Sequence, residues 1–272
     1  MLRLTIPVVV SLALTVACAR KASSPGANAV TITATDFAFA APDTIPAGLT
    51  TLRIVNRGAD VHHAILIRIP EGMSRAAVDS AMQTPGPPPA WMSFAASPIA
   101  ALPGDSTNAT SVLEAGRYLM VCFIEGTDRV PHIAKGMTRW FAVVGTPAAV
   151  AEPKADVVIT LSDYAFALST PLTAGTHTIR VENTGPQMHE VGIERLAAGK
   201  TQADYLAWIQ GGGQGAPLVT PAGGLIGPDV GKRGYFTVTL TPGRYLLTCY
   251  VPDKTTGRPH VMHGMVQEIT VS

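Results

Sequence analysis

Two sets of four potential metal ligands follow one another along the chain. Each set consists of a His, then a Cys, a second His and a Met, and the step from the second His to the Met is five residues in both. The step from Cys to His is ten residues in one set and eleven in the other. The sets are His62, Cys122, His132 and Met137, and His189, Cys249, His260 and Met265.

The donor atoms of each set are two imidazole nitrogens, one thiolate and one thioether. They suit a trigonal site with a long axial bond, in which soft sulfur favours the reduced ion and imidazole tolerates the oxidised one. Copper cycling between Cu(I) and Cu(II) matches this combination. A single Cys or Met is usually part of a core, so the prediction of copper depends on four ligand types occurring in one order, twice in one chain.

The two sets belong to an internal repeat with a constant offset of 127 residues. Asp-Phe-Ala-Phe at 36–39 recurs as Asp-Tyr-Ala-Phe at 163–166, and Gly-Arg-Tyr-Leu at 116–119 recurs at 243–246. A fixed offset of this kind indicates two copies of one fold. The predicted organisation is a signal segment at 1–18, a tether at 19–28, a first domain at 29–144, a linker at 145–155 and a second domain at 156–272.

Each copy has the pattern of short strands separated by turns. Apolar and polar residues alternate at 157–162, and further strands are expected at 178–181 and 235–238. Many short strands per copy favour an all-β fold, either a sandwich or a barrel. One short helix is predicted in each copy, because Ser74 and Thr201 occupy N-cap positions before helix-forming stretches.

In this order of residues the chain resembles the cupredoxins, the blue copper family that includes plastocyanin and azurin. The family has a His after an Asn-containing strand end, and later a Cys, a His and a Met around a loop. Asn56 and Asn183 fill the Asn position here, and Gly136 and Gly264 precede the Met. The resemblance implies two tandem Greek-key β-sandwiches, each with one short inserted helix and one mononuclear type 1-like copper.

The resemblance also implies one-electron transfer to redox partner proteins. In the family the imidazole edge of the second His is the usual exit, so the loop with His132 or His260 is expected to face the partner. Two alternatives from other classes are a copper storage or delivery protein and a metal-free module for protein contacts.

Motifs of the copper enzymes are missing from the sequence. Multicopper oxidases and laccases need several His-X-His motifs and a His-Cys-His tripeptide, and none of these occurs. A copper nitrite reductase has a His directly after the Cys, where this chain has Phe123 and Tyr250. These absences lead to the expectation that the protein is not an enzyme.

Three further His residues are not assigned as ligands. His63 and His263 lack a His at the equivalent position of the other copy, and His177 lies in a predicted turn. The repeat aligns His62, and not His63, with His189. The three are therefore expected at the surface or beside the ligands.

The N-terminus has the pattern of an export signal. Arg3 precedes an apolar run at 4–17, which is short of the roughly 20 residues that span a bilayer. Thr-Val-Ala-Cys at 15–18 is similar to the lipobox of bacterial lipoproteins, which implies a lipid on Cys18. We expect an exported protein, periplasmic or attached to the outer membrane; ordinary cleavage and release is the alternative.

The number of cysteines and the net charge limit the kinds of partner that the chain is expected to bind. With Cys18 assigned to a lipid, Cys122 and Cys249 remain, and equivalent positions of two adjacent sandwiches are too far apart for a disulfide. The 20 Lys and Arg against 19 Asp and Glu give a net charge of +1. Such a chain has no basic field for phosphates, so no nucleic-acid partner is expected, and membrane contact only through the lipid.

Overall fold

The computed structural model describes residues 26–84 and 88–272. The predicted signal segment with Cys18, and most of the predicted tether at 19–28, lie outside the described residues. Within the described ranges, no helix is both long enough and apolar enough to cross a membrane.

The N-terminal half consists mainly of short strands, with one α-helix and one 3₁₀-helix. In chain order these are β1 (Asn28–Thr35), β2 (Ala38–Ala40), β3 (Thr44–Pro46), β4 (Gly48–Asn56), β5 (Ile65–Ile69), α1 (Arg75–Gln83), β6 (Ser93–Ala95), β7 (Ser97–Pro98), β8 (Ser106–Leu113), β9 (Gly116–Val121), η1 (His132–Lys135) and β10 (Thr138–Val144).

The C-terminal half has a similar order of elements. They are β11 (Val157–Ser162), β12 (Ala165–Leu168), β13 (Gly175–Asn183), β14 (Val191–Leu196), α2 (Gln202–Gln210), β15 (Val219–Ile226), β16 (Arg233–Leu240), β17 (Gly243–Thr248), η2 (His260–His263) and β18 (Val266–Val271). The all-β prediction is confirmed, and both predicted helices are present with their caps. Ser74 Oγ accepts from the N–H of Ala77, and Thr201 forms a capping box with Asp204.

One sheet runs through both halves. Its eight strands have the order β12-β11-β13-β16-β8-β4-β1-β2, and β16 meets β8 where Tyr235 pairs with Thr110. A five-stranded sheet, β3-β10-β9-β5-β6, covers its first half, and β18-β17-β14-β15-β7 covers its second. Because β7 comes from the N-terminal half and pairs with β15, the two halves are joined at two places.

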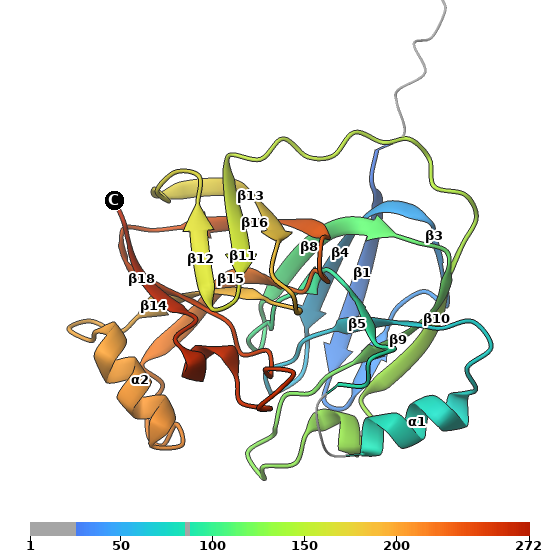
Figure 1. Cartoon of the computed structure of the whole chain (residues 1–272), viewed down its shortest axis with the longest axis horizontal. Helices are drawn as coiled ribbons and strands as arrows, with labels where there is room; N and C mark the ends of the chain where they lie inside the picture. The colour runs from blue at the N-terminus through green and yellow to red at the C-terminus, as the bar shows by residue number, and fades with distance from the viewer. Residues whose placement is uncertain (1–25, 85–87) are drawn as a thin grey trace, which may run out of the picture.

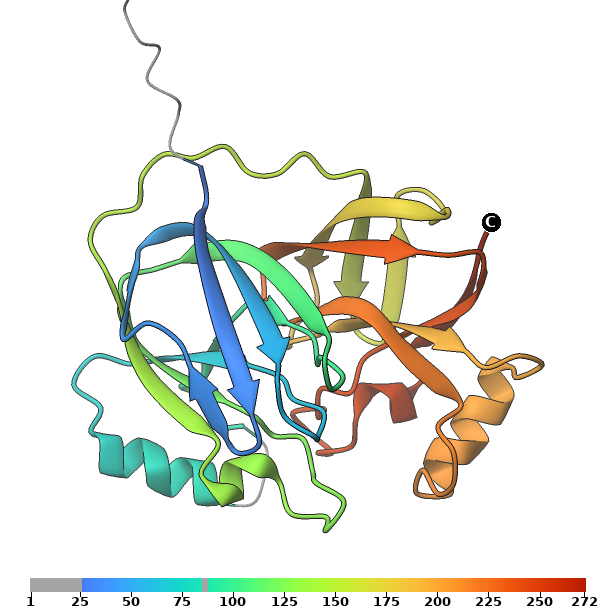
Figure 2. The same cartoon turned by 180° about the vertical axis from the view of Figure 1, so that it is seen from behind.

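Figure 1 shows the halves side by side, with α1 and α2 along the same edge of the molecule. The segment from β10 to β11 passes along the opposite edge, as the reverse view in Figure 2 also shows. An apolar core lies between the sheets of each half, and each core contains the Cys and the Met of one ligand set.

The repeated Gly-Arg-Tyr sequence fixes the strand that leads to each Cys. The Tyr118 hydroxyl donates to the carbonyl oxygen of Glu114, and the Tyr245 hydroxyl to that of Thr241, both at 2.9 Å. Gly116 has φ +153°, a conformation that favours glycine. These two tyrosine corners anchor β9 and β17 immediately before the Cys ligands.

Candidate metal centres

The first predicted ligand set converges in the N-terminal half. The Nδ1 atoms of His62 and His132 are 3.1 Å apart, and Cys122 Sγ lies 3.5 Å from His132 Nδ1. The three donor atoms lie within 4.8 Å of one another, and all three side chains are fully buried. Met137 is buried in the same core cluster as Cys122.

The second set converges in the same way. The Nδ1 atoms of His189 and His260 are 3.0 Å apart, and Cys249 Sγ lies 3.4 Å from His260 Nδ1. These side chains are also fully buried, and Met265 packs in the same cluster as Cys249. In the part of the chain that the structure describes, these two groups are the ones whose His, Cys and carboxylate donors approach closely enough to share an ion.

An Asn side chain holds the loop that carries the first His of each set. Asn56 Nδ2 donates to the carbonyl oxygens of Asp60 and Ala101 at 2.7 and 2.9 Å, and its Oδ1 accepts from the N–H of Gly58. Asn183 makes the corresponding two donations at 2.8 and 3.0 Å. The Asn therefore positions the ligand loop from within.

Backbone hydrogen bonds close the loop from Cys to Met. In the first half, the N–H of Ile133 donates to the carbonyl oxygen of Cys122 at 2.8 Å, and the N–H of Met137 to that of His132 at 3.0 Å. The second half repeats both bonds at 2.7 and 3.0 Å. Gly136 ends η1 with φ +92°, which allows the chain to reverse just before the Met.

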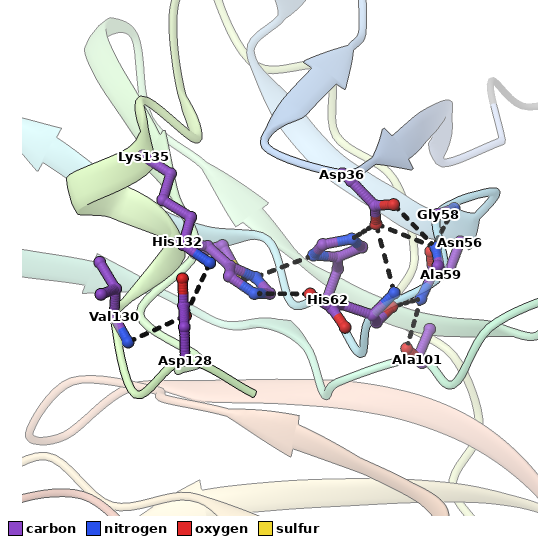
Figure 3. A network of polar contacts seen from close by, with 12 residues as sticks. Asp36, Asn56, Gly58, Ala59, His62, Ala101, Asp128, Val130, His132 and Lys135 are labelled. Atoms are coloured by element: carbon purple, nitrogen blue, oxygen red, sulfur yellow. Dashed lines mark hydrogen bonds and ion pairs between the residues drawn. The ribbon is translucent and has the colours of Figure 1, made fainter. Parts of the chain in front are cut away.

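A carboxylate orients the first imidazole of each pair, as Figure 3 shows for the N-terminal half. His62 Nε2 lies 3.0 Å from Asp36 Oδ1, and His189 Nε2 lies 2.7 Å from Asp163 Oδ1. Because a carboxylate accepts hydrogen bonds, Nε2 carries the proton and Nδ1 keeps its lone pair. At Gly58 a Cβ would stand 2.7 Å from His62 Nε2, so glycine leaves room for this approach.

Burial determines the protonation of the ligands before a metal ion binds. It lowers the pKa of His132 and of His189, and it brings the pKa of His260 to about 4. These imidazoles are therefore neutral at neutral pH. Burial raises the pKa of the Cys122 and Cys249 thiols, so a metal ion that binds there displaces the thiol proton.

The geometry fits a metal ion. Nε2 of His132 is buried without a hydrogen bond, and the nearest carboxylate, Asp60 Oδ2, is 3.5 Å away. When His132 carries its proton on Nε2, facing Asp60, its Nδ1 has a free lone pair. The Nδ1 lone pairs of His62 and His132 then face each other. A cation bound to both nitrogens stabilises this arrangement. Two nitrogens bound at about 2.0–2.1 Å to one ion lie about 3–3.5 Å apart. Two nitrogens, a thiolate and a thioether are a copper donor set.

An aromatic ring covers the second imidazole of each pair. The ring centroids of Phe37 and His132 are 5.3 Å apart, as are those of Tyr164 and His260, in edge-on contact. Phe37 and Tyr164 have φ values of +66° and +46°, which are uncommon for residues with a Cβ. Both imidazoles are fully buried, so neither ring edge is exposed in this structure, and the expectation that their loops face a partner stays a prediction.

The orienting carboxylates and the covering rings were not predicted as parts of the sites. All four residues belong to the segments 36–39 and 163–166, which the sequence marked only as a repeat. A sequence signal for these residues was therefore present, because an acidic residue followed by an aromatic one recurs at the same offset of 127 as the first His and the Cys of each set.

The other His residues lie outside the two groups. His63 Nε2 accepts a hydrogen bond from the N–H of Phe123 at 2.8 Å, directly beside the first site. The His263 ring stacks on Tyr164, with 5.1 Å between centroids. His177 lies on β13, with Nε2 2.8 Å from the carbonyl oxygen of Thr173.

Solved structures that are similar to this chain include copper proteins. No protein-family model and no curated protein matches the chain. Auracyanin from the photosynthetic bacterium Roseiflexus castenholzii is similar, with 22% identity over 44% of this chain and 100% of that chain, at a TM-score of 0.32. The blue copper oxidase from Nitrosomonas europaea is 19% identical over 90% of this chain and 84% of that one, at a TM-score of 0.24. The all-β fold and the ligand assignment both depend on the strand pairing and the donor geometry described above.

The structural comparison corrects one expectation. A copper-containing nitrite reductase from Thermus scotoductus SA-01 is 11% identical over 90% of this chain and 61% of that one, at a TM-score of 0.23. A multicopper oxidase and a laccase from Botrytis aclada are also among the similar structures. Because enzymes are among the similar structures, the missing motifs do not support the expectation that the chain is not an enzyme, and we withdraw that expectation.

Proposed function

We propose that the chain binds two mononuclear, type 1-like copper ions and passes single electrons between redox partner proteins. The observation that carries the proposal is the convergence, twice in one chain, of two imidazole Nδ1 atoms and one thiol in a fully buried position. Bound copper supplies a one-electron couple between Cu(I) and Cu(II).

The protein holds the ligands in place before the ion binds. Asp36 and Asp163 fix the tautomer and direction of one imidazole in each pair, and such partners usually strengthen metal binding. Burial keeps water from the ligands, and the tied loops limit their movement. A site that moves little suits electron transfer, because little rearrangement accompanies the change in charge.

The visible spectrum tests this function. Cu(II) is added to the purified protein, and the expected result is a strong thiolate-to-copper band that disappears on reduction and in the double variant Cys122→Ser, Cys249→Ser. Tight Cu(I) binding without such a band would favour copper storage or delivery. A folded protein that binds neither ion would contradict the copper proposal and favour a module for protein contacts.

We also propose export and attachment through a lipid on Cys18, as the lipobox-like sequence at 15–18 implies. Mass spectrometry of the mature N-terminus is expected to find a lipidated Cys18 as the first residue. An unmodified terminus at another position would contradict lipidation and favour simple cleavage.

A further inference from the structure

A cleft of about 600 Å³ lies between the two halves, beside both candidate copper sites. Its walls include His63 and Phe123 from the N-terminal half, and Glu190 and Tyr250 from the C-terminal half. Each of these four residues directly follows a His or Cys ligand in the sequence. The cleft is therefore a feature separate from the ligand groups but adjacent to both.

The four residues form two equivalent pairs, since Glu190 and Tyr250 are 127 residues after His63 and Phe123. The N–H of Phe123 donates to His63 Nε2, and the N–H of Tyr250 donates to Glu190 Oε1, both at 2.8 Å. The repeat has thus placed a base on one wall and an acid on the other.

Most of the remaining wall is apolar. Both halves contribute aliphatic, aromatic and thioether side chains, among them Met82, Phe94, Met188 and Ile226. The volume and this lining are typical of a site for a small organic molecule. A bare ion would fill only a small part of it.

Acidic groups are concentrated on the wall from the C-terminal half. Glu190 and Glu194 are only 8% and 9% exposed. Glu194 accepts hydrogen bonds from the hydroxyls of Tyr205 and Tyr250, at 3.4 and 3.3 Å. Within residues 26–84 and 88–272, neither carboxyl has a Lys or Arg partner, and His63 is the one basic side chain that lines the cleft.

Two buried carboxyl groups without a cationic partner are costly in an apolar setting, because buried charges are normally paired. Burial raises the pKa of Glu194 to about 7, which is the response expected of an unpaired carboxyl. In their ionised form, which predominates above about pH 7, the same groups repel anions. A cation that enters the cleft gains a carboxylate partner and lies near the aromatic rings of Phe123 and Tyr250 in its wall.

We propose that this cleft binds an organic cation, a molecule that carries an amine or amidinium group on an apolar body. The cationic group lies against Glu190 and Glu194, and the body fills the apolar part between the halves. Binding depends on the cleft and not on copper, so the proposal is independent of the function proposed above.

Three ligands of nearly the same shape test the charge requirement: naphthalene-2-carboxamidine, the neutral carboxamide and the anionic carboxylate. Isothermal titration calorimetry on the copper-free chain is expected to show the amidine binding at least tenfold more tightly than the amide, with the carboxylate weakest. Equal binding of amidine and amide, or no binding of either, would overturn the proposal.

A variant series locates the site. Glu194→Gln keeps the side-chain shape and is expected to weaken amidine binding at least tenfold without changing amide binding. Glu182→Gln, on β13 and away from the cleft, is the control and is expected to bind like the wild type. Circular dichroism verifies folding, and the ligand series on the wild type remains decisive if Glu194→Gln does not fold.

Copper provides the last arm of the test. Amidine affinity is expected to be the same before and after Cu(II) loading. If Cu(II) displaced the amidine, the carboxyl groups would be taking the metal ion itself, and the proposal of an organic ligand would fail.

Discussion

The two candidate copper sites have the same four ligand types, but three nearby positions differ between the halves. Three positions of the N-terminal half have apolar side chains where the C-terminal half has a hydrogen-bonded cluster. The pairs are Ile67 and Glu194, Val78 and Tyr205, and Phe123 and Tyr250. In the second half, the hydroxyls of Tyr205 and Tyr250 contact each other, and both lie within hydrogen-bond distance of the Glu194 carboxyl group. The repeat has therefore kept the ligands while the surroundings changed from apolar to polar.

The polar groups that contact the covering rings also differ between the two halves. Lys135 Nζ lies 4.5 Å from the centre of the Phe37 ring. The Tyr164 hydroxyl instead donates to Asp253 Oδ2 at 2.8 Å, and hydrogen bonds from Thr256, Gln187 and Tyr164 hold the pKa of Asp253 well below its usual value. Hydrogen bonding and polarity around a copper site tune its potential. Two sites with one ligand set are therefore expected to have different potentials.

The largest effect is expected from removing one thiol at a time. Cys122→Ser and Cys249→Ser should each lower the copper content from two ions to one per chain, because the ligand groups share no residue. Elemental analysis after dialysis measures the ratio. Loss of both ions in either variant would show that the sites are not independent.

The second largest effect is expected from removing the carboxylates that orient the first imidazole of each pair. Asp36→Asn and Asp163→Asn should each weaken copper binding about 10–100-fold, and only at the site of the altered residue. Competition with a chelator measures the affinity. Asp43→Asn, which removes the ion-pair partner of Arg139, serves as the matched control, and a similar loss in that variant would contradict a specific role.

The buried carboxyl group of Glu194 should make the stability of the protein depend on pH. Native Glu194 keeps its proton up to about pH 7, whereas the unfolded chain releases it near 4.5. The native state therefore binds more protons between these values, and this group lowers stability as the pH rises. Glu194→Gln should remove that loss, so its copper-free form gains up to about 3 kcal/mol relative to the wild type across this window.

Urea unfolding of both proteins at pH 4.5 and 7 measures the difference. Glu182→Gln is the control, since Glu182 lies outside the cluster on β13. A constant difference between Glu194→Gln and the wild type at the two pH values would contradict the assigned protonation.

The smallest effects on stability are expected from removing the N-cap side chains of the two helices, and the two losses should differ. Ser74 makes one cap hydrogen bond, whereas Thr201 takes part in a reciprocal pair with Asp204. Ser74→Ala should lower the free energy of unfolding by about 0.5–1 kcal/mol, and Thr201→Ala by about 1–2 kcal/mol. Denaturant unfolding gives both values, and equal losses would show that the capping box adds nothing.

Local signals in the sequence predicted much of the fold. Ser74 and Thr201 located both helices, and the alternation at 157–162 predicted the strand there. The shared sheet was not predictable, because the contact of Tyr235 with Thr110 joins positions 125 residues apart in the sequence. Such pairing depends on how the halves pack, which no local pattern encodes.

The ligand types and their order were visible in the sequence, but the environment of the sites was not. The second imidazoles are covered because Phe37 and Tyr164 adopt positive φ values, and residue type does not predict that conformation. No pattern in the sequence singled out Glu190 or Glu194. Only the structure shows them buried together in a cleft.

The central claim is that both halves hold a redox-active copper ion. A coulometric titration of the fully copper-loaded chain, with the visible band recorded at each step, tests it most directly. The account predicts two electrons taken up per chain, in two one-electron couples at different potentials, and none in the double variant Cys122→Ser, Cys249→Ser. Uptake of a single electron, or bound copper without a reversible couple, would contradict it.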